Sequence, residues 1–454
     1  MIGSPALAMR ARVVLVGFGI LLASGGILAA QTAEPAGSSG SPGSVSLTLE
    51  QAVARARTNQ PLILQAQAAV AAARERVGEA QSTYYPSLSG AGSYTYVQPD
   101  QAFVFPGLGK FILSPSNNWD FHLGLNQIIT QFGKRDVQVR MAESGLASAR
   151  IGMDQVQTAI SYQAAMVFYT ALFLQEQGKA LEEQYQNLQQ HLQVIQVREQ
   201  TGSATRLEDL STQVRMAALQ GQRTDVESQF AKQKIALRQL TGLDPATDIT
   251  LSGGFEPGSV PAEPSALVAS ALQKRPDVRQ AVEAENAAAI NEKLTFASVL
   301  PTLSARGTIG YRNGLLPDIN ALTFDWTAGV SLNVPLFQGF LGAHGLEEAK
   351  KKVESAKQST SAAKLTAATQ VLQAAQDVQA ARRIVEISAG ALEQARQMVE
   401  VAKLQYDIGV ISNFEYLDAQ TALETANVSN LGARYKEVMS EYALRQAVGE
   451  TLGE

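Results

Sequence analysis

The chain has 454 residues, of which 45% are hydrophobic and 17% are charged, so it can bury a large core. Its formal net charge of −5 argues against a nucleic-acid-binding protein, and we expect no nucleic-acid partner. The absence of cysteine excludes disulfides, thiolate metal sites, a cysteine nucleophile and a lipidated N-terminal cysteine.

The first thirty residues have the pattern of a signal peptide. Arg10 and Arg12 precede the apolar run VVLVGFGILLASGGILAA, which ends in small residues and is followed by a polar stretch. We therefore predict a signal peptide over residues 1–30 and a flexible N-terminus over residues 31–46. A retained membrane anchor is the alternative, because residues 13–30 are just long enough to span a bilayer. No later stretch is a candidate transmembrane helix.

The rest of the chain consists of two copies of one unit. Prolines and tyrosines of the two halves align at one offset, and later glycine, glutamate and leucine positions align at a second. The aligned pairs are Pro61/Pro276, Pro86/Pro301, Tyr96/Tyr311, Gly202/Gly409, Glu208/Glu415 and Leu210/Leu417. Such a repeat indicates that one supersecondary unit has been duplicated. We predict repeat 1 at residues 47–242, a linker rich in proline and glycine at 243–264, and repeat 2 at 265–449.

Each repeat is predicted to contain, in order, a helix, a β-hairpin, a long helix, a tip and a further helix. The first helix of repeat 1 is predicted to begin at Thr48, with Gln51 at the capping-box position, and to run unbroken over residues 49–83. The predicted hairpins cover residues 86–131 and 301–336, and the predicted tips lie near Gly202 and Gly409.

A long stretch without proline follows each hairpin. These stretches cover residues 133–200 and 339–407, and as helices each would be about 100 Å long. Helices of this length need partners along their whole length, and apolar and small residues spaced by threes and fours in the second stretch indicate coiled-coil packing. Shorter helices are predicted at 205–241 and 412–448. Together with the first helices, they are long enough to lie end to end beside a long one.

The four predicted strands each have one apolar face and one polar face. The apolar positions are Leu88, Gly90, Gly92, Tyr94, Tyr96, Trp119, Phe121, Leu123, Leu125, Leu303, Ala305, Gly307, Ile309, Tyr311, Trp326, Ala328, Val330, Leu332 and Val334. Runs of about ten residues with this alternation, and with aromatic residues near the hairpin tips, are typical of transmembrane β-strands. A soluble sheet packed on a core is the alternative, because alternation alone does not distinguish lipid from protein.

Four strands cannot close a barrel, and an open sheet edge in lipid leaves backbone groups without hydrogen bonds. We therefore predict an oligomer. Two copies would supply eight strands around an interior filled by side chains, and three would supply twelve strands around a lumen. The polar faces would then line water. The residues predicted to face this lumen include Asp120, Asn126, Arg306 and Arg312.

Several motifs follow one another in a specific order. They are TLEQAV at 48–53, a proline at each helix-to-strand junction, and the tip sequences TGSATRLEDL at 201–210 and IGVISNFEYLDAQ at 408–420. In this order, and within a duplicated plan, they resemble the TolC-like outer membrane efflux protein family over residues 47–449. The resemblance implies an α+β membrane protein. Three chains would close one twelve-stranded barrel in the outer membrane of a Gram-negative bacterium, and their helices would form a coiled-coil tunnel through the periplasm.

The resemblance also implies partners. These are two further copies of the chain in a homotrimer, outer membrane lipid, a periplasmic adaptor protein, and an inner-membrane transporter of the RND, ABC or MFS type. The adaptor would dock at the tips, where the candidate docking residues are Gly202, Gly409, Thr205 and Ser412.

The second tip carries the candidate constriction. By resemblance, Glu415 and Asp418 occupy the two acidic positions that ring the periplasmic entrance in this family, and Tyr406 matches a tyrosine associated with the closed state. Three-residue spacing places both carboxylates on one helix face. Ser412 and Glu415 also form a predicted capping box, so helix capping is the simpler role of that glutamate. A surface charge is the simpler role of Asp418.

Two classes of function fit these patterns. The first is an outer membrane channel that serves as the passive exit duct of a tripartite efflux or type I secretion system. The alternative is a periplasmic coiled-coil adaptor or scaffold without a barrel. No nucleophile, acid–base or phosphate-binding constellation occurs, and His122, His191 and His344 lack metal-ligand spacing. We therefore expect neither an enzyme nor a cofactor or metal site.

Overall fold

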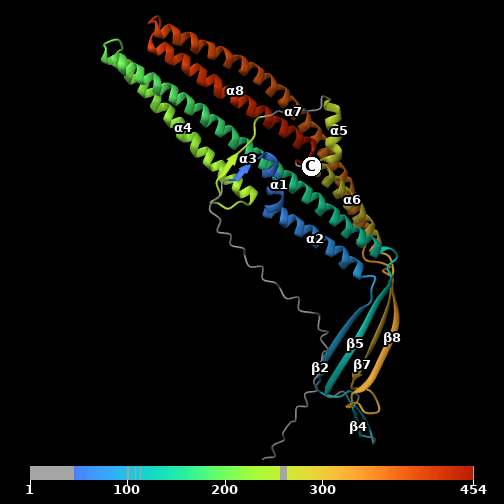
Figure 1. Cartoon of the computed structure of the whole chain (residues 1–454). Coiled ribbons are helices and arrows are strands. Elements are labelled where there is room, and N and C mark those ends of the chain that lie inside the picture. Colours follow the sequence, from blue (N-terminus) through green and yellow to red (C-terminus); the bar gives the residue numbers. More distant parts are fainter. Residues whose placement is uncertain (1–44, 100–101, 108, 113, 256–262, 453–454) are drawn as a thin grey trace, which may run out of the picture. The chain divides into compact units, whose positions relative to one another are not determined.

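Each half of the chain contributes two short helices, a β-hairpin, a long helix and a further helix (Figure 1). The computed structural model describes residues 45–99, 102–107, 109–112, 114–255 and 263–452, so the predicted signal peptide lies outside the described residues. The helices are α1 (Leu49–Asn59), α2 (Pro61–Ser82), α3 (Lys134–Gln200), α4 (Arg206–Thr241), α5 (Pro264–Lys274), α6 (Pro276–Ala297), α7 (Leu341–Asp407) and α8 (Asn413–Val448).

The first helix predicted for repeat 1 is interrupted. Gln60 has an extended backbone, with φ −72° and ψ 123°, so α1 ends before it and α2 begins at Pro61. The second repeat has the same break between α5 and α6, where Pro276 follows Arg275. Proline disfavours a helical conformation of the preceding residue and has no N–H to continue the hydrogen-bond ladder. The predicted capping box at Thr48 is present.

The two long helices, α3 and α7, each have 67 residues, which confirms the long helices predicted from the sequence. α2 and α4 pack along α3, whereas α6 and α8 pack along α7. The shorter helices thus flank the long helices in succession, as their lengths predicted. α3 also packs against α6 and α8, which joins the two repeats side by side (Figure 1). Within the described ranges, no helix is both long enough and apolar enough to cross a lipid bilayer.

A four-stranded antiparallel sheet extends from the ends of α2, α3, α6 and α7 (Figure 1). Its strands, in spatial order, are β2 (Ser87–Tyr96), β5 (Asn117–Thr130), β7 (Thr302–Arg312) and β8 (Thr323–Asn333). The central β5–β7 pair links the two repeats and contains an irregularity between Ile128 and Thr130. β2 and β8 are the edge strands of this sheet.

A further hairpin lies between β2 and β5. Its strands are β3 (Ala102–Phe105) and β4 (Gly109–Ile112), which within the described ranges pair only with each other. These two strands were not predicted from the sequence. This hairpin accounts for the longer connection in repeat 1, because the β7–β8 connection of repeat 2 spans only residues 313–322.

The strand register keeps the predicted faces together. Leu123 of β5 pairs with Gly90 of β2 and Ile309 of β7, whereas Asn126 pairs with Ser87 and Arg306. Since directly paired residues lie on the same face of a sheet, the apolar positions form one surface and the polar positions form the other. Aromatic rings contact one another on the apolar surface, as where the centroids of Tyr94 and Trp119 lie 4.4 Å apart.

A small parallel sheet joins the start of the described chain to the segment between the repeats. β1 (Val45–Leu47) pairs with β6 (Ile249–Leu251), so the last residues of the predicted flexible N-terminus and part of the predicted linker are ordered in strands. Leu47 and Ile249 are buried there against α3, α4 and α8. The core residues that they meet include Phe168, Leu172, Leu237 and Val438.

Candidate functional site

Both tips reverse the chain through the same backbone motif. Gly202 follows α3 and Gly409 follows α7, with φ 75° and 76° respectively, so both adopt the left-handed conformation that glycine favours just after a helix. In the first tip the N–H of Ser203 donates to the carbonyl oxygen of Arg198 at 2.7 Å, and the second tip has the equivalent bond at 2.8 Å. These bonds satisfy carbonyl groups that a helix end leaves without partners.

The helices that follow the tips begin with side-chain caps. Ser412 Oγ accepts a hydrogen bond from the Glu415 N–H at 3.3 Å, and Glu415 Oε2 accepts from the Ser412 N–H at 2.8 Å, which confirms the predicted capping box. These bonds lower the pKa of the exposed Glu415 carboxyl, chiefly through the backbone N–H of Ser412. In the first tip, Thr205 Oγ1 accepts from the Glu208 N–H at 3.4 Å.

The two predicted constriction carboxylates lie together but apart from Tyr406. Glu415 and Asp418 are exposed and share one face of α8. Tyr416 is buried and points the other way, because the helical repeat places it on the opposite side of α8. Tyr406 stacks on Tyr416, so within one chain it does not share a surface with the two carboxylates.

Tyr406 is the centre of an aromatic and charged cluster between α3, α7 and α8. Its ring lies 5.5 Å from that of Tyr416, with an angle of 14° between the two planes. The Arg198 guanidinium lies 5.1 Å from the Tyr406 ring centroid, and its Nη2 lies 3.6 Å from Asp407 Oδ1. Burial raises the pKa of the Tyr406 hydroxyl, so this group stays protonated at neutral pH. The cluster therefore connects the end of α3 with the end of α7.

His191 and Asn413 extend this cluster to α4. The His191 ring lies 4.7 Å from the Tyr416 ring, and its Nε2 is 2.7 Å from Asn413 Oδ1. Asn413, which is buried, donates through Nδ2 to Thr212 Oγ1 at 3.3 Å. One side chain at the start of α8 thus holds both α3 and α4, and it ties together the two helical hairpins that carry the tips.

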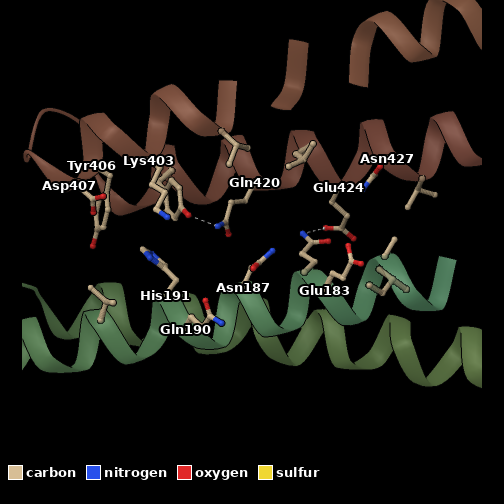
Figure 2. Close-up of a pocket in the computed structure, with 18 residues that line it drawn as sticks. Glu183, Asn187, Gln190, His191, Lys403, Tyr406, Asp407, Gln420, Glu424 and Asn427 are labelled. Carbon is tan, nitrogen blue, oxygen red and sulfur yellow. Dashed lines mark hydrogen bonds between the residues drawn. The ribbon is translucent and has the colours of Figure 1, made fainter. Parts of the chain in front are cut away.

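A polar groove of about 470 Å³ extends from this cluster between α3 and the α7–α8 pair (Figure 2). Gln184 Nε2 donates to Glu424 Oε2 across it at 3.0 Å, and Gln420 Nε2 donates to the Tyr416 hydroxyl at 2.7 Å. Other polar residues that line it are Glu183, Asn187, Gln190, Lys403, Asp407 and Asn427. Among the described residues, no group of histidines and carboxylates has the arrangement of a metal site.

The residues predicted to face a lumen share one face of the sheet. Asp120 pairs with Arg312, and Asn126 pairs with Arg306, across the β5–β7 ladder. Arg312 Nε lies 2.5 Å from Asp325 Oδ2 of β8. These contacts place the four predicted residues on the polar face.

Most of the Tyr406 cluster was not predicted from the sequence. His191 was noted only for its lack of metal-ligand spacing, and Arg198, Tyr416 and Asn413 were not candidates. A comparison of the two repeats contains a usable signal, because Tyr416 and Asn413 align with Asp209 and Arg206 at the offset that aligns the two tips. Positions where a duplicated motif changes residue type are candidates for contacts that only one copy makes.

We expect the contact between the two tips to weaken as the pH falls below about 6.5. Burial lowers the pKa of His191 below its ordinary value of 6.5, and the nearby Arg198 adds to this, whereas the Asn413 hydrogen bond, Asp407 and Glu208 oppose it. When the contact is broken and the His191 imidazole is exposed, it therefore takes up a proton at a higher pH than it does when it is packed in the cluster. The contact is then fully stable above the ordinary pKa and loses stability as the pH falls toward the lowered one.

Hydrogen exchange of backbone amides near His191 and Asn413 measures this effect between pH 5 and 7.5. The matched control is His191→Gln, which cannot titrate in this range. After correction for the intrinsic pH dependence of exchange, the wild type should lose protection at low pH and the variant should not. An equal change in both proteins would contradict the role of His191.

Comparison with known proteins identifies the family. A model of the outer membrane efflux protein family matches residues 52–243 and 267–450, which together make up most of the chain. The pyoverdine export outer membrane protein OpmQ of Pseudomonas putida is 26% identical over 342 residues, covering 74% of this chain and 69% of that protein. The outer membrane protein TolC of Vibrio cholerae is 24% identical over 407 residues, covering 88% of this chain and 90% of that protein.

Solved structures show the same fold. The outer membrane protein VceC of Vibrio cholerae matches with a TM-score of 0.75 and 19% identity, over 89% of this chain and 97% of that one. The CmeC outer membrane channel of Campylobacter jejuni matches with a TM-score of 0.76 and 19% identity, over 89% of this chain and 87% of that one. The matches confirm the resemblance drawn from the sequence and indicate a Gram-negative outer membrane protein that extends into the periplasm. The chain belongs to the outer membrane efflux protein family.

Proposed function

We propose that three copies of this chain form one twelve-stranded barrel in the outer membrane, and that their helices continue it as a tunnel through the periplasm. The observation that supports this proposal is the four-stranded sheet with two open edges. Among the described residues, β2 pairs only with β5 and β8 only with β7. Unpaired backbone groups cost several kcal/mol each in lipid, so both edges need strands from other copies.

The exposed faces of this sheet favour three copies over two. An eight-stranded barrel has an interior just wide enough for its own side chains. Here the polar face carries Asp120, Arg306, Arg312 and Asp325, and charged groups require hydration when they face an interior. Twelve strands would enclose a water-filled lumen around them. The apolar face would then meet lipid.

The assembled channel would serve as the passive exit duct of a tripartite efflux or type I secretion system. An inner-membrane transporter of the RND, ABC or MFS type would supply the energy, and a periplasmic adaptor would connect it to the tips. Support for docking comes from apolar side chains beside Thr205 and Ser412. Leu207 and Phe414 occupy equivalent positions in the two repeats and are 75% and 76% exposed. Gly202 and Gly409 shape the turns that present them.

The entrance of the proposed tunnel would be narrowed by the second tip. Three chains would bring Glu415 and Asp418 into two rings of three carboxylates around a common axis. Tyr406 lies on the other side of α8 and would keep the tips together, because its contacts with Arg198 and Tyr416 hold the end of α7 against α3. Separation of this cluster would allow the tips to move apart.

Disulfide cross-linking tests whether β2 of one copy pairs with β8 of the next in the proposed barrel. The chain has no native cysteine, so every disulfide must come from the introduced residues. Cysteine pairs are introduced with one member on β2, at Ser89 or Ser93, and the other on β8, at Thr327 or Ser331. Disulfides form only when Cα atoms lie within about 7 Å, so at least one pair should give covalent trimers on oxidation. Cysteine at Asn126 of the central strand β5, combined with the same β8 positions, should give no links between chains. If oxidation gives cross-linked dimers but no trimers, or no cross-linked species at all, the trimeric barrel is rejected.

A further inference from the structure

We propose that Arg306 forms an anion-attracting station inside the barrel and favours passage of solutes that carry carboxylate, sulfate or phosphate groups. This inference rests on the proposed trimeric barrel and adds a class of cargo to it. Arg306 lies in the middle of β7, where its direct neighbours on the polar face are Asn126 of β5 and Gly329 of β8. Neither neighbour carries a charge.

The charges on the polar face are unevenly compensated. Near the hairpin tips, Arg312 forms an ion pair with Asp325, and His122 contacts the carboxylate of Asp120. In the part of the chain that the structure describes, the exposed guanidinium of Arg306 makes no ion pair or hydrogen bond with a protein group. Arg306 is therefore available to a solute, whereas Arg312 is already neutralised.

The surroundings of Arg306 suit a small anion. A groove of about 710 Å³ runs along the polar face beside it, and hydroxyl groups of Ser87, Ser89, Ser304 and Ser331 line this groove. A guanidinium offers paired N–H donors that match carboxylate, sulfate and phosphate. Ser87 and Ser89 already donate to backbone carbonyls, whereas the hydrogen bond between Ser304 and Ser331 uses only one of their two hydroxyl protons, so the other can donate to an anionic oxygen. A Cβ added at Gly329 would meet no atom within 4 Å, so the space facing Arg306 is open.

The charged residues near the hairpin tips lie too far away to cancel the electrostatic field of the Arg306 guanidinium. Arg306 and Arg312 are six residues apart on one strand, which corresponds to about 20 Å along β7. This separation exceeds the screening length of about 8 Å at physiological ionic strength. In the trimer, three copies of Arg306 would surround the lumen at one level, and their fields would add.

A cysteine at Gly329 serves as a local probe of this potential. Outer membrane vesicles that contain Gly329→Cys are treated with a negatively charged or a positively charged methanethiosulfonate reagent, and the modification rates are measured by mass spectrometry. A unit charge about 8 Å from the thiol in water changes the ratio of the two rates by about fivefold. We expect Arg306→Gln to lower the anionic-to-cationic rate ratio by at least this factor. The matched control, Arg312→Gln in the same background, should leave the ratio unchanged.

A second cysteine separates failure of this inference from failure of the barrel. Val330 neighbours Gly329 but lies on the apolar face, so Val330→Cys should be shielded by lipid and react with neither reagent. If Gly329→Cys reacts and Val330→Cys does not, but Arg306→Gln leaves the ratio unchanged, the anion station alone is rejected. If both cysteines react equally, or only Val330→Cys reacts, the assignment of the faces fails, and the barrel and the anion station are both rejected.

Discussion

Replacing Val330 by arginine is expected to prevent stable assembly of the sheet in the outer membrane. Val330 is 67% exposed in the single chain and lies on the apolar face, where it pairs with Ala305 of β7. An arginine on the lipid face near the middle of a bilayer costs about 2 to 4 kcal/mol. Because the substitution occurs once in every chain, the cost to a trimer would be three times larger. Leu123→Arg, on β5, should have the same effect.

The neighbouring residue provides a matched control for this prediction. Ser331 lies on the polar face, where its Oγ is 3.1 Å from Ser304 Oγ, and Ser331→Arg should be tolerated because its side chain would reach water. Asn126→Arg is the equivalent control on β5. The amount of cross-linked or heat-resistant trimer in outer membrane fractions measures assembly. Equal loss of trimer for Val330→Arg and Ser331→Arg would contradict the assignment of the two faces.

Removal of both tip carboxylates is expected to abolish block of the channel by a trivalent cation. In planar bilayers the wild type should show a small conductance that is cation-selective, because the proposed carboxylate rings at the narrow entrance, and not the wider barrel, determine the selectivity for small ions. This conductance should fall when a trivalent metal complex is added on the periplasmic side. Charges near a common axis interact more strongly than in bulk water because they are partly desolvated. Asp418→Ala should weaken the block without other effects, since this side chain is exposed and caps no helix.

The single variant at Glu415 should be harder to interpret than the one at Asp418. Glu415 accepts hydrogen bonds from both the N–H and the hydroxyl of Ser412, so Glu415→Ala also removes part of the helix cap. The double variant should lose the block while retaining the trimer. A double variant with unchanged selectivity and block would show that the constriction lies elsewhere.

The parts of the fold with a local physical cause were predictable from the sequence. The starts of α4 and α8 follow from Thr205 and Ser412, whose side chains cap them, and the ends of α3 and α7 follow from Gly202 and Gly409. The strand faces follow from alternation, which pairing preserves because partners on adjacent strands share a face. In each case a few neighbouring residues determine the conformation.

The parts that depend on distant residues were not predictable in this way. β1 and β6 each have only three residues, and neither has a pattern that distinguishes it from a loop without its partner. His191 and Tyr416 meet only because α3 and α8 pack side by side. The break before Pro61 is different, because its cause is local. The high helix propensity of the flanking residues concealed it.

The pairing of β1 with β6 has a consequence for the order in which the chain folds. Ser46 of β1 and Ser252, which directly follows β6, are 206 positions apart, so β1 cannot pair until the whole of the first repeat is available. Contacts of such long range make folding slow, because the entropy of closing the loop is lost before the contact stabilises it. A chain delivered from its N-terminus would expose the apolar side chains of Leu47 and its neighbours throughout that interval. The newly delivered chain is therefore most vulnerable to aggregation and proteolysis before the linker between the repeats arrives.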